Sequence, residues 1–285
     1  MNRITNFLFG GTGRTETAAK LGIEIETQFL DSDGQPILSE ETLAILASVE
    51  GKPDYCELKL ELGRHNLELN IKPQKDFATL WPTVCESLGW LHNLCATCGY
   101  FAAHEPAPLI NYTGELLLVA EERDQIWVDL DGKQALEKLC RCSSVQFTID
   151  VNPEDAICWI NKMWAAKVHR YDYTQNDFLW QRYIAESSFG YRADRYGGPN
   201  GFMDLDDYVR RLAQNEVVMH QGQSCRKMVG DVEKLDVNLF LRSVWWHYRL
   251  RRYSNNLAIE IRPFSRRTDE DILAKWLYLA DILGI

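Results

Sequence analysis

The sequence predicts one α+β domain over residues 1–285, with helices packed on one face of an antiparallel sheet. Two observations predict this class. Apolar and polar residues alternate along several short segments, which is typical of strands with one buried face. In other segments apolar residues recur every three to four positions, which is the spacing of an amphipathic helix. Because no internal repeat, low-complexity block or linker interrupts the chain, a single domain is the economical interpretation.

The strands expected from the alternating pattern are Leu21–Leu30, Glu57–Leu62, Asn66–Ile71, Ser143–Val151 and Leu257–Phe264, with further β-type sequence over Leu116–Leu130. The turn Gly63-Arg64-His65 joins the second and third of them into a hairpin. The expected helices are Ser39–Ser48, Asp76–Ala103, Asn152–Val168, Asp204–Asn215, Leu235–Arg249 and Thr268–Leu283. Several begin with residues that favour helix starts, such as Asn152 followed by Pro153.

Two segments show neither the two-residue alternation of a strand nor the three-to-four-residue spacing of a helix. Residues 1–19 are expected to form a flexible entry segment, because Phe9–Thr17 is rich in Gly and Thr but lacks the Gly-Lys-Ser/Thr end of a phosphate-binding loop. The aromatic segment Tyr171–Gly201 is expected to be a loop. Its Arg192 and Arg195 are either ligands of a carboxylate or phosphate or solvated surface residues.

The composition is that of a globular protein, with 46% hydrophobic and 25% charged residues. A net charge of -10 argues against a protein that binds nucleic acid or a membrane surface through a basic face. The negative charge does not exclude small anionic substrates, because metal ions can invert the charge of an acidic site. No apolar run reaches the ~18 residues of a membrane span. Since the first residues also lack the order of a signal peptide, we expect a cytoplasmic location.

The eight cysteines are expected to be reduced in a chain of this kind. Cys95 and Cys98 form a C-x-x-C on an expected helix. A structural zinc site would need a second ligand pair, and Cys140 and Cys142 have the wrong spacing for one. Cys95 and Cys98 are therefore interpreted as core residues.

The first expected strand contains an acidic pair, Glu24 and Glu26, in the stretch Gly22-Ile-Glu-Ile-Glu-Thr27. Alternate side chains of a strand share a face, so the two carboxylates point the same way, roughly 7 Å apart. Taken alone, this strand is better explained as an antiparallel strand with one solvated face.

Three other expected strands repeat the arrangement, each with one apolar face. Their polar faces carry Glu68 and Asn70, then Gln146, Thr148 and Asp150, then Glu260 and Arg262. If the strands are neighbours at ~4.8 Å, several carboxylates converge and repel one another. A divalent hard cation such as Mg²⁺ removes this repulsion and bridges carboxylates to nucleotide phosphates.

These motifs resemble those of the glutamate–cysteine ligases and related carboxylate–amine ligases. The resemblance rests on four matches in the order of the family: Gly22-x-Glu-x-Glu26, the hairpin from Leu60-Glu61 to Glu68-Leu69, Ser144-Val-Gln-Phe-Thr-Ile-Asp150, and Trp245-Trp-His-Tyr-Arg249 followed by Ile259-Glu-Ile-Arg262. It implies the glutamine-synthetase-like catalytic domain, in which a curved antiparallel sheet has an acidic concave face and helices cover the other face.

The resemblance also implies a function. In the family a substrate carboxylate attacks the γ-phosphate of ATP, and an amine then attacks the acyl phosphate. By carry-over, the Mg²⁺ ions (two or more) would be bound by Glu24, Glu26, Glu61, Glu68, Gln146 and Glu260. Arg262 would neutralise the transferred phosphoryl group, and Arg249 would hold a substrate carboxylate or a phosphate. For both arginines, ion pairing with the acidic cluster is the alternative. A relative that binds nucleotide without turnover, or a structural domain with a solvated acidic face, is the alternative for the whole protein.

Overall fold

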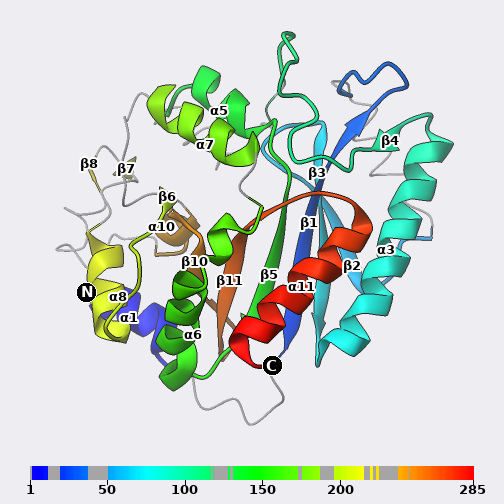
Figure 1. Ribbon diagram of the computed structural model, residues 1–285. Helices are drawn as coiled ribbons and strands as arrows, with labels where there is room; N and C mark the ends of the chain where they lie inside the picture. Colours follow the sequence, from blue (N-terminus) through cyan, green and yellow to red (C-terminus); the bar gives the residue numbers. More distant parts are fainter. Residues whose placement is uncertain are drawn as a thin grey trace.

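The computed structural model describes residues 2–11, 20–37, 51–116, 118, 128, 131–172, 175–186, 196–214, 219–220, 223–224, 237–242 and 244–285. Figure 1 shows a central sheet with helices against one face and two further helices beyond its upper edge. The expected α+β class with a mostly antiparallel sheet is confirmed.

The main sheet of the described chain has seven strands, and six of them follow the order β10-β11-β5-β1-β3-β2, with β4 paired to β1. All neighbours in it are antiparallel. Its strands are β1 (Leu21–Leu30), β2 (Cys56–Leu60), β3 (Asn66–Gln74), β4 (Phe101–Ala102), β5 (Ser144–Asp150), β10 (Tyr248–Tyr253) and β11 (Asn256–Ser265). The four strands with acidic or amide faces are therefore consecutive neighbours.

The register of the sheet brings the predicted site residues side by side. Glu26 lies opposite Glu68, and Glu24 lies between Asn70 on β3 and Gln146 on β5. Between Ile261 and Phe264 the register of β11 against β5 shifts. Such a bulge re-aims a side chain, and here it contains Arg262.

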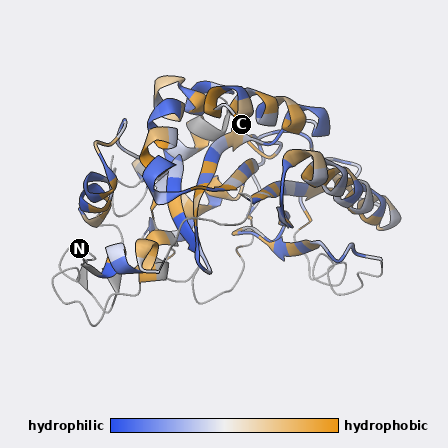
Figure 2. Cartoon of the chain, turned by 90° about the horizontal axis from the view of Figure 1, so that it is seen from below, coloured by the Kyte–Doolittle hydropathy of each residue, from blue (hydrophilic) through white to orange (hydrophobic). Residues whose placement is uncertain are grey.

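The apolar face of the sheet is covered by α3 (Phe77–Thr97), α6 (Pro153–Ala165) and α11 (Asp269–Leu283). Hydrophobic and hydrophilic residues alternate along the strands, as Figure 2 shows. Aromatic rings fill the space between sheet and helices: Phe147 contacts Phe264 edge-on at 5.8 Å, and Trp276 stacks on Phe77 at 4.8 Å. Burial of this face stabilises the fold by about 25 cal/mol for each Å² of apolar surface.

The remaining described elements are α1 (Asn2–Phe9), α5 (Lys133–Leu139), the 3-10 helix η1 (Val168–Arg170), α7 (Gln175–Glu186), β6 (Tyr196–Gly197), α8 (Leu205–Ala213), β7 (Met219–His220), β8 (Gln223–Ser224), α10 (Val237–Arg242) and β9 (Trp245–Trp246). The short strands β6 and β9 pair in parallel, and α5 lies beside α7 (Figure 1).

Four expectations need correction. The expected helix over 76–103 ends at Thr97 and is followed by β4. Residues 2–9 are not a flexible entry but helix α1, because Ile4 and Leu8 share a face and are fully buried. The expected loop over 171–201 contains α7, whose Leu179 and Tyr183 are buried. The expected helix over 235–249 ends at Arg242 and is followed by two strands. Other expectations fall outside the described residues. These are the helix over 39–48, most of the β-type sequence over 116–130, and residues 12–19 of the entry segment.

Of the two cysteines expected in the core, Cys95 is buried and Cys98 is only partly buried. All seven cysteines in the described ranges are free thiols, and Cys95 is buried in the core beside Leu91 and Phe29. Within those ranges, no helix combines the length and the apolar character that crossing a membrane requires.

Candidate active site

A cavity of about 810 Å³ lies on the polar face of the sheet, opposite the covering helices. Its floor consists of the side chains that the alternation pattern placed on one face. The predicted residues that line it are Glu24, Glu26, Glu61, Glu68, Gln146, Arg249, Glu260 and Arg262. Arg192 and Arg195 lie outside the described residues. A volume of this size is within the range of small-molecule sites.

Three carboxylates form an acidic cluster at the β1–β3 side of the cavity: Glu26, Glu61 and Glu68. One oxygen from each lies within 4.8 Å of the others. Glu26 and Glu68 face each other across β1 and β3, and Glu61 follows directly after β2. Asn70 Nδ2 donates to Glu68 Oε1 at 2.6 Å and so orients this carboxylate. An all-oxygen donor set of this kind suits a hard divalent cation such as Mg²⁺.

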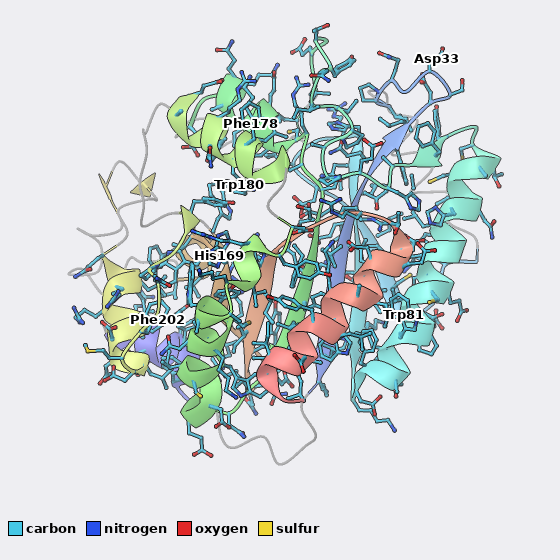
Figure 3. All side chains as sticks on the ribbon, in the orientation of Figure 1. Asp33, Trp81, His169, Phe178, Trp180 and Phe202 are labelled. Atoms are coloured by element: carbon cyan, nitrogen blue, oxygen red, sulfur yellow. The ribbon has the colours of Figure 1, made fainter. Side chains whose placement is uncertain are left out.

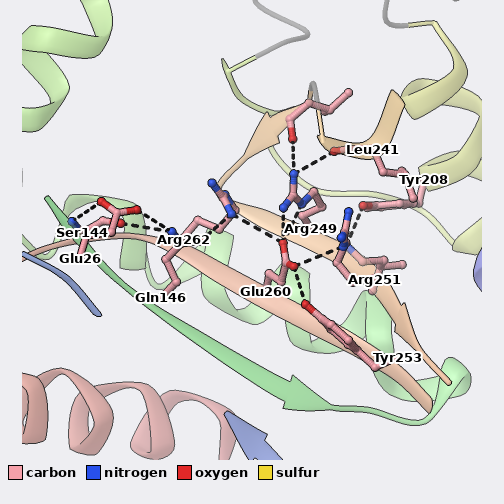
Figure 4. Close-up of polar contacts among 12 residues, drawn as sticks. Glu26, Ser144, Gln146, Tyr208, Leu241, Arg249, Arg251, Tyr253, Glu260 and Arg262 are labelled. Carbon is pink, nitrogen blue, oxygen red and sulfur yellow. Dashed lines mark hydrogen bonds and ion pairs between the residues drawn. The ribbon is translucent and has the colours of Figure 1, made fainter. Parts of the chain in front are cut away.

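Glu26, a member of the acidic cluster, is held by two donors from β5 (Figure 4). The backbone N–H of Ser144 donates to Glu26 Oε2 at 2.8 Å, and Gln146 Nε2 donates to Glu26 Oε1 at 3.0 Å. Burial and the neighbouring Glu68 raise the pKa of Glu26, although the Ser144 hydrogen bond and Arg262 act in the other direction. A carboxylate that is fixed by donors and still short of positive charge is suited to bind a cation.

Gln146 links this carboxylate to a cationic group. Arg262 Nη1 donates to Gln146 Oε1 at 2.5 Å, and the same nitrogen lies 3.7 Å from Glu260 Oε2. The backbone N–H of Arg262 donates to the carbonyl of His247, which holds the bulged strand in place. Arg262 thus lies between the acidic cluster and Glu260, with a guanidinium that lines the cavity.

Glu260 is surrounded by cationic and hydroxyl donors (Figure 4). Arg249 donates from Nε to Glu260 Oε2 at 2.7 Å, Tyr253 donates to Oε1 at 2.8 Å, and Arg251 Nε lies 3.3 Å from Oε1. Burial alone would raise the pKa of this carboxyl, but Arg249, Arg251 and Arg262 together lower it to about 2. Both of its oxygens are therefore engaged by guanidinium or hydroxyl donors, whereas the donors to Glu26 and Glu68 are neutral amides.

Arg249 is engaged in the same way. Its Nη1 donates to the carbonyls of Leu241 and Val244 at 2.8 and 3.0 Å, while its other nitrogens pair with Glu260. Of the two roles that the sequence left open, ion pairing within the site is the one that this geometry favours for Arg249.

Glu24 lies between the two groups. Burial and the nearby Glu68 and Glu260 raise the pKa of Glu24 to about 8. In the metal-free protein this side chain is therefore largely protonated at neutral pH, and a bound cation would favour its ionised form.

This shift predicts a pH dependence for Glu24→Gln. A carboxyl whose pKa rises from 4.5 to about 8 on folding adds stability below pH 4.5 and loses it as the pH rises towards 8. Without divalent cations, wild type should therefore lose stability relative to Glu24→Gln between pH 5 and pH 8, by no more than about 1.4 kcal/mol per pH unit. Thermal unfolding in a chelator at several pH values measures this, and parallel profiles for the two proteins would contradict it.

Several residues of the cavity were not predicted. Arg251 and Tyr253 share the face of Arg249 on β10, and a strand pattern over 248–253 would have identified them. An aromatic wall of Trp180, Tyr196 and Trp245 closes another side, with Trp180 stacked on Tyr196 at 4.6 Å. Figure 3 shows Trp180 pointing from α7 towards β6. His247 continues this wall, and burial beside His169 and Arg262 lowers its pKa to about 3, so its imidazole is neutral.

No protein-family model matches the sequence, and no curated protein matches it. Solved structures do match. The glutamate–cysteine ligase of Francisella tularensis in complex with AMP aligns with 95% of this chain and 67% of its own, at a TM-score of 0.51 and 12% identity. A bifunctional glutathione synthetase from Pasteurella multocida aligns with 93% of this chain and 39% of its own, at a TM-score of 0.48 and 12% identity. The chain thus spans well under half of the Pasteurella protein. The protein shares the fold of the Francisella glutamate–cysteine ligase.

Proposed function

We propose that the protein is an ATP- and Mg²⁺-dependent ligase that joins a carboxylate to an amine through an acyl phosphate. The γ-carboxylate of glutamate is the proposed acyl donor, and cysteine or a related amino acid or amine is the proposed acceptor. The observation that carries this proposal is one cavity in which an open acidic cluster lies beside a fixed arginine. The fold shared with a glutamate–cysteine ligase solved with AMP supports it.

The acidic cluster fits the cation that such a reaction needs. Glu26, Glu61 and Glu68 offer oxygen ligands within 4.8 Å, and Glu24 and Gln146 border them. Burial and the neighbouring carboxylates raise the pKa values of Glu24 and Glu26, and a bound cation would favour the ionised form of both. Bound there, Mg²⁺ would neutralise phosphate charge and orient the nucleotide.

Arg262 supplies the second requirement, a fixed positive charge. Attack of a carboxylate on a phosphate brings two anions together, so charge must be neutralised where the new bond forms. Gln146 and Glu260 hold the Arg262 guanidinium before substrate arrives, which avoids the cost of orienting it during the reaction. Because Glu260 is itself fixed by Arg249 and Arg251, we assign it to positioning Arg262 rather than to direct contact with a cation.

The incoming amine must lose a proton and approach the acyl phosphate. Ionised carboxylates of the cavity can attract its ammonium form, and the aromatic wall of Trp180, Tyr196 and Trp245 offers an apolar surface for its body. No nucleophilic side chain is required, since the γ-phosphate itself activates the acyl group.

The experiment is ADP release with Mg·ATP, glutamate and a panel of amino acids and amines. We expect release that requires Mg²⁺ and glutamate and that rises with one acceptor or a small group of them. Thermal stabilisation by Mg·ATP without any ADP release would instead identify a nucleotide-binding relative without turnover. If the protein neither binds Mg·ATP nor releases ADP, the acidic face is explained as the solvated surface of a structural domain.

A further inference from the structure

A second group of metal-binding side chains lies outside the cavity: His92, His104 and Asp269. They come from three segments that are distant in sequence, since His92 is on α3, His104 follows β4 and Asp269 is the first residue of α11. None of the three lines the cavity. Because α3 and α11 cover the apolar face of the sheet, this group is on the side of the sheet opposite the acidic cluster (Figure 1).

The three side chains converge on one point. His92 Nε2 donates to Asp269 Oδ2 at 2.9 Å, and His104 Nδ1 lies 3.9 Å from Asp269 Oδ1. The two imidazole rings stack with centroids 4.9 Å apart and an interplanar angle of 19°. One ligand atom from each residue lies within 4.8 Å of the others. Donors around one Zn²⁺ ion at ~2.0–2.2 Å are roughly 3.3 Å apart, so small side-chain rotations bring this set to coordination distance.

The carboxylate is oriented as metal-binding carboxylates usually are. Arg266 is fully buried, and its Nη2 donates to Asp269 Oδ1 at 2.5 Å. This contact fixes the Asp269 carboxylate and leaves Oδ2, the oxygen that faces His92, for an ion. Outer partners of this kind orient metal ligands and tune their affinity.

The donor types select the ion. Two imidazole nitrogens and one carboxylate oxygen suit first-row transition ions such as Zn²⁺, whereas Mg²⁺ favours oxygen ligands. Arg266 also offsets part of the Asp269 charge, which weakens the site for a hard cation that depends on that charge. The His92, His104 and Asp269 side chains are 32%, 38% and 27% exposed, so an ion can enter and water can complete its coordination.

We propose that His92, His104 and Asp269 form a binding site for one first-row transition metal ion, with Zn²⁺ as the reference ion. The ion takes the place of the hydrogen between His92 Nε2 and Asp269 Oδ2, and a neutral imidazole that binds it through Nε2 carries its one N–H at Nδ1. It ties α3, the segment after β4 and α11 to one another on the helical side of the sheet. A contact between residues this far apart in sequence stabilises the fold because the ion binds the folded chain and not the unfolded one.

The test is calorimetric titration of the full-length protein with Zn²⁺, beside His104→Gln, His92→Gln and Glu68→Gln. For wild type we expect one ion per chain whose binding depends on the two histidines. Either histidine variant should lower the affinity at least as much as the roughly 10- to 100-fold seen when an outer partner is lost. His104 is exposed and in a loop, so His104→Gln should fold, and its ADP release should equal that of wild type. Glu68→Gln, which alters only the acidic cluster, should bind Zn²⁺ at this site as wild type does.

Co²⁺ serves as a second probe, because Cys85 and Cys158 are exposed thiols that also take Zn²⁺. We expect a Co²⁺ spectrum without a thiolate charge-transfer band, and its loss in His104→Gln. The proposal is overturned if wild type binds neither ion, if binding is unchanged in both histidine variants, or if Glu68→Gln alone abolishes it.

Discussion

Glu260→Gln is expected to lower the free energy of unfolding by about 3–5 kcal/mol and to abolish Mg²⁺-dependent ADP release. Glu260 is 5% exposed, and Arg249, Arg251 and Arg262 all lie within 3.7 Å of its oxygens. Removing the charge leaves buried guanidinium groups without a counter-ion, which costs far more than the lost hydrogen bonds. Arg262 also loses the partner that positions it beside Gln146, so turnover should fall even in molecules that remain folded.

Glu57→Gln is the matched control for this variant. Glu57 is a carboxylate of the same sheet, on β2, whose ion pair with Lys59 is more than half exposed. Its replacement should change stability by no more than about 0.5 kcal/mol. Denaturant unfolding of both variants measures the difference in their free energies of unfolding. For a chain of this size, the expected loss in Glu260→Gln corresponds to a thermal midpoint lower by roughly 10 °C. A Glu260→Gln variant as stable as Glu57→Gln would show that the arginines do not depend on Glu260.

Glu68→Gln should abolish turnover, as Glu260→Gln does, but should leave the stability of the fold intact. Glu68 belongs to the acidic cluster, and its charge contributes to the raised pKa values of Glu24 and Glu26. The amide keeps an oxygen for Asn70 Nδ2 and offers N–H groups to the neighbouring carboxylates, so the metal-free variant should be at least as stable as wild type. Loss of a ligand should reduce Mg²⁺ affinity and ADP release by roughly 100-fold or more.

Thermal unfolding with and without Mg²⁺ separates this prediction from a purely structural role. Wild type and Glu57→Gln should gain stability on addition of Mg²⁺, whereas Glu68→Gln should gain little. A Glu68→Gln variant that is stabilised by Mg²⁺ as strongly as wild type would remove Glu68 from the proposed metal site.

The strands that build the site could be predicted because period-2 alternation is a local property of the chain. Glu24, Glu68, Gln146 and Glu260 each follow an apolar neighbour that points to the core, and the structure makes their four strands neighbours. Which residue lies opposite which is a tertiary property. No local pattern could show that Glu26 faces Glu68, or that the bulge at Arg262 aims its guanidinium at Gln146.

The segment after Arg242 was mispredicted for a physical reason. A strand with one face to the core normally reads as apolar residues alternating with exposed polar ones, but here Arg249 is 5% exposed because it pairs with Glu260. Arg249 is buried in the cavity wall, whereas Tyr253 on the same face is 42% exposed. With the aromatic pair Trp245-Trp246 before it, the segment resembled a helix. Arg251 and Tyr253, which share the face of Arg249, were missed because a helix was expected up to Arg249 and no strand over 248–253. Helix α1 was missed because the Gly-rich residues after it suggested flexibility, although Ile4 and Leu8 have helical spacing.

The central claim, a carboxylate activated by phosphorylation, is tested most directly by following an oxygen atom. In the proposed reaction one γ-carboxylate oxygen of glutamate bonds to the transferred phosphorus and leaves with phosphate when the amine attacks. With glutamate labelled with oxygen-18 in that carboxylate, Mg·ATP and an amine acceptor, the released phosphate should carry one labelled oxygen. Phosphate without label would contradict the account, because its fourth oxygen would then have come from water.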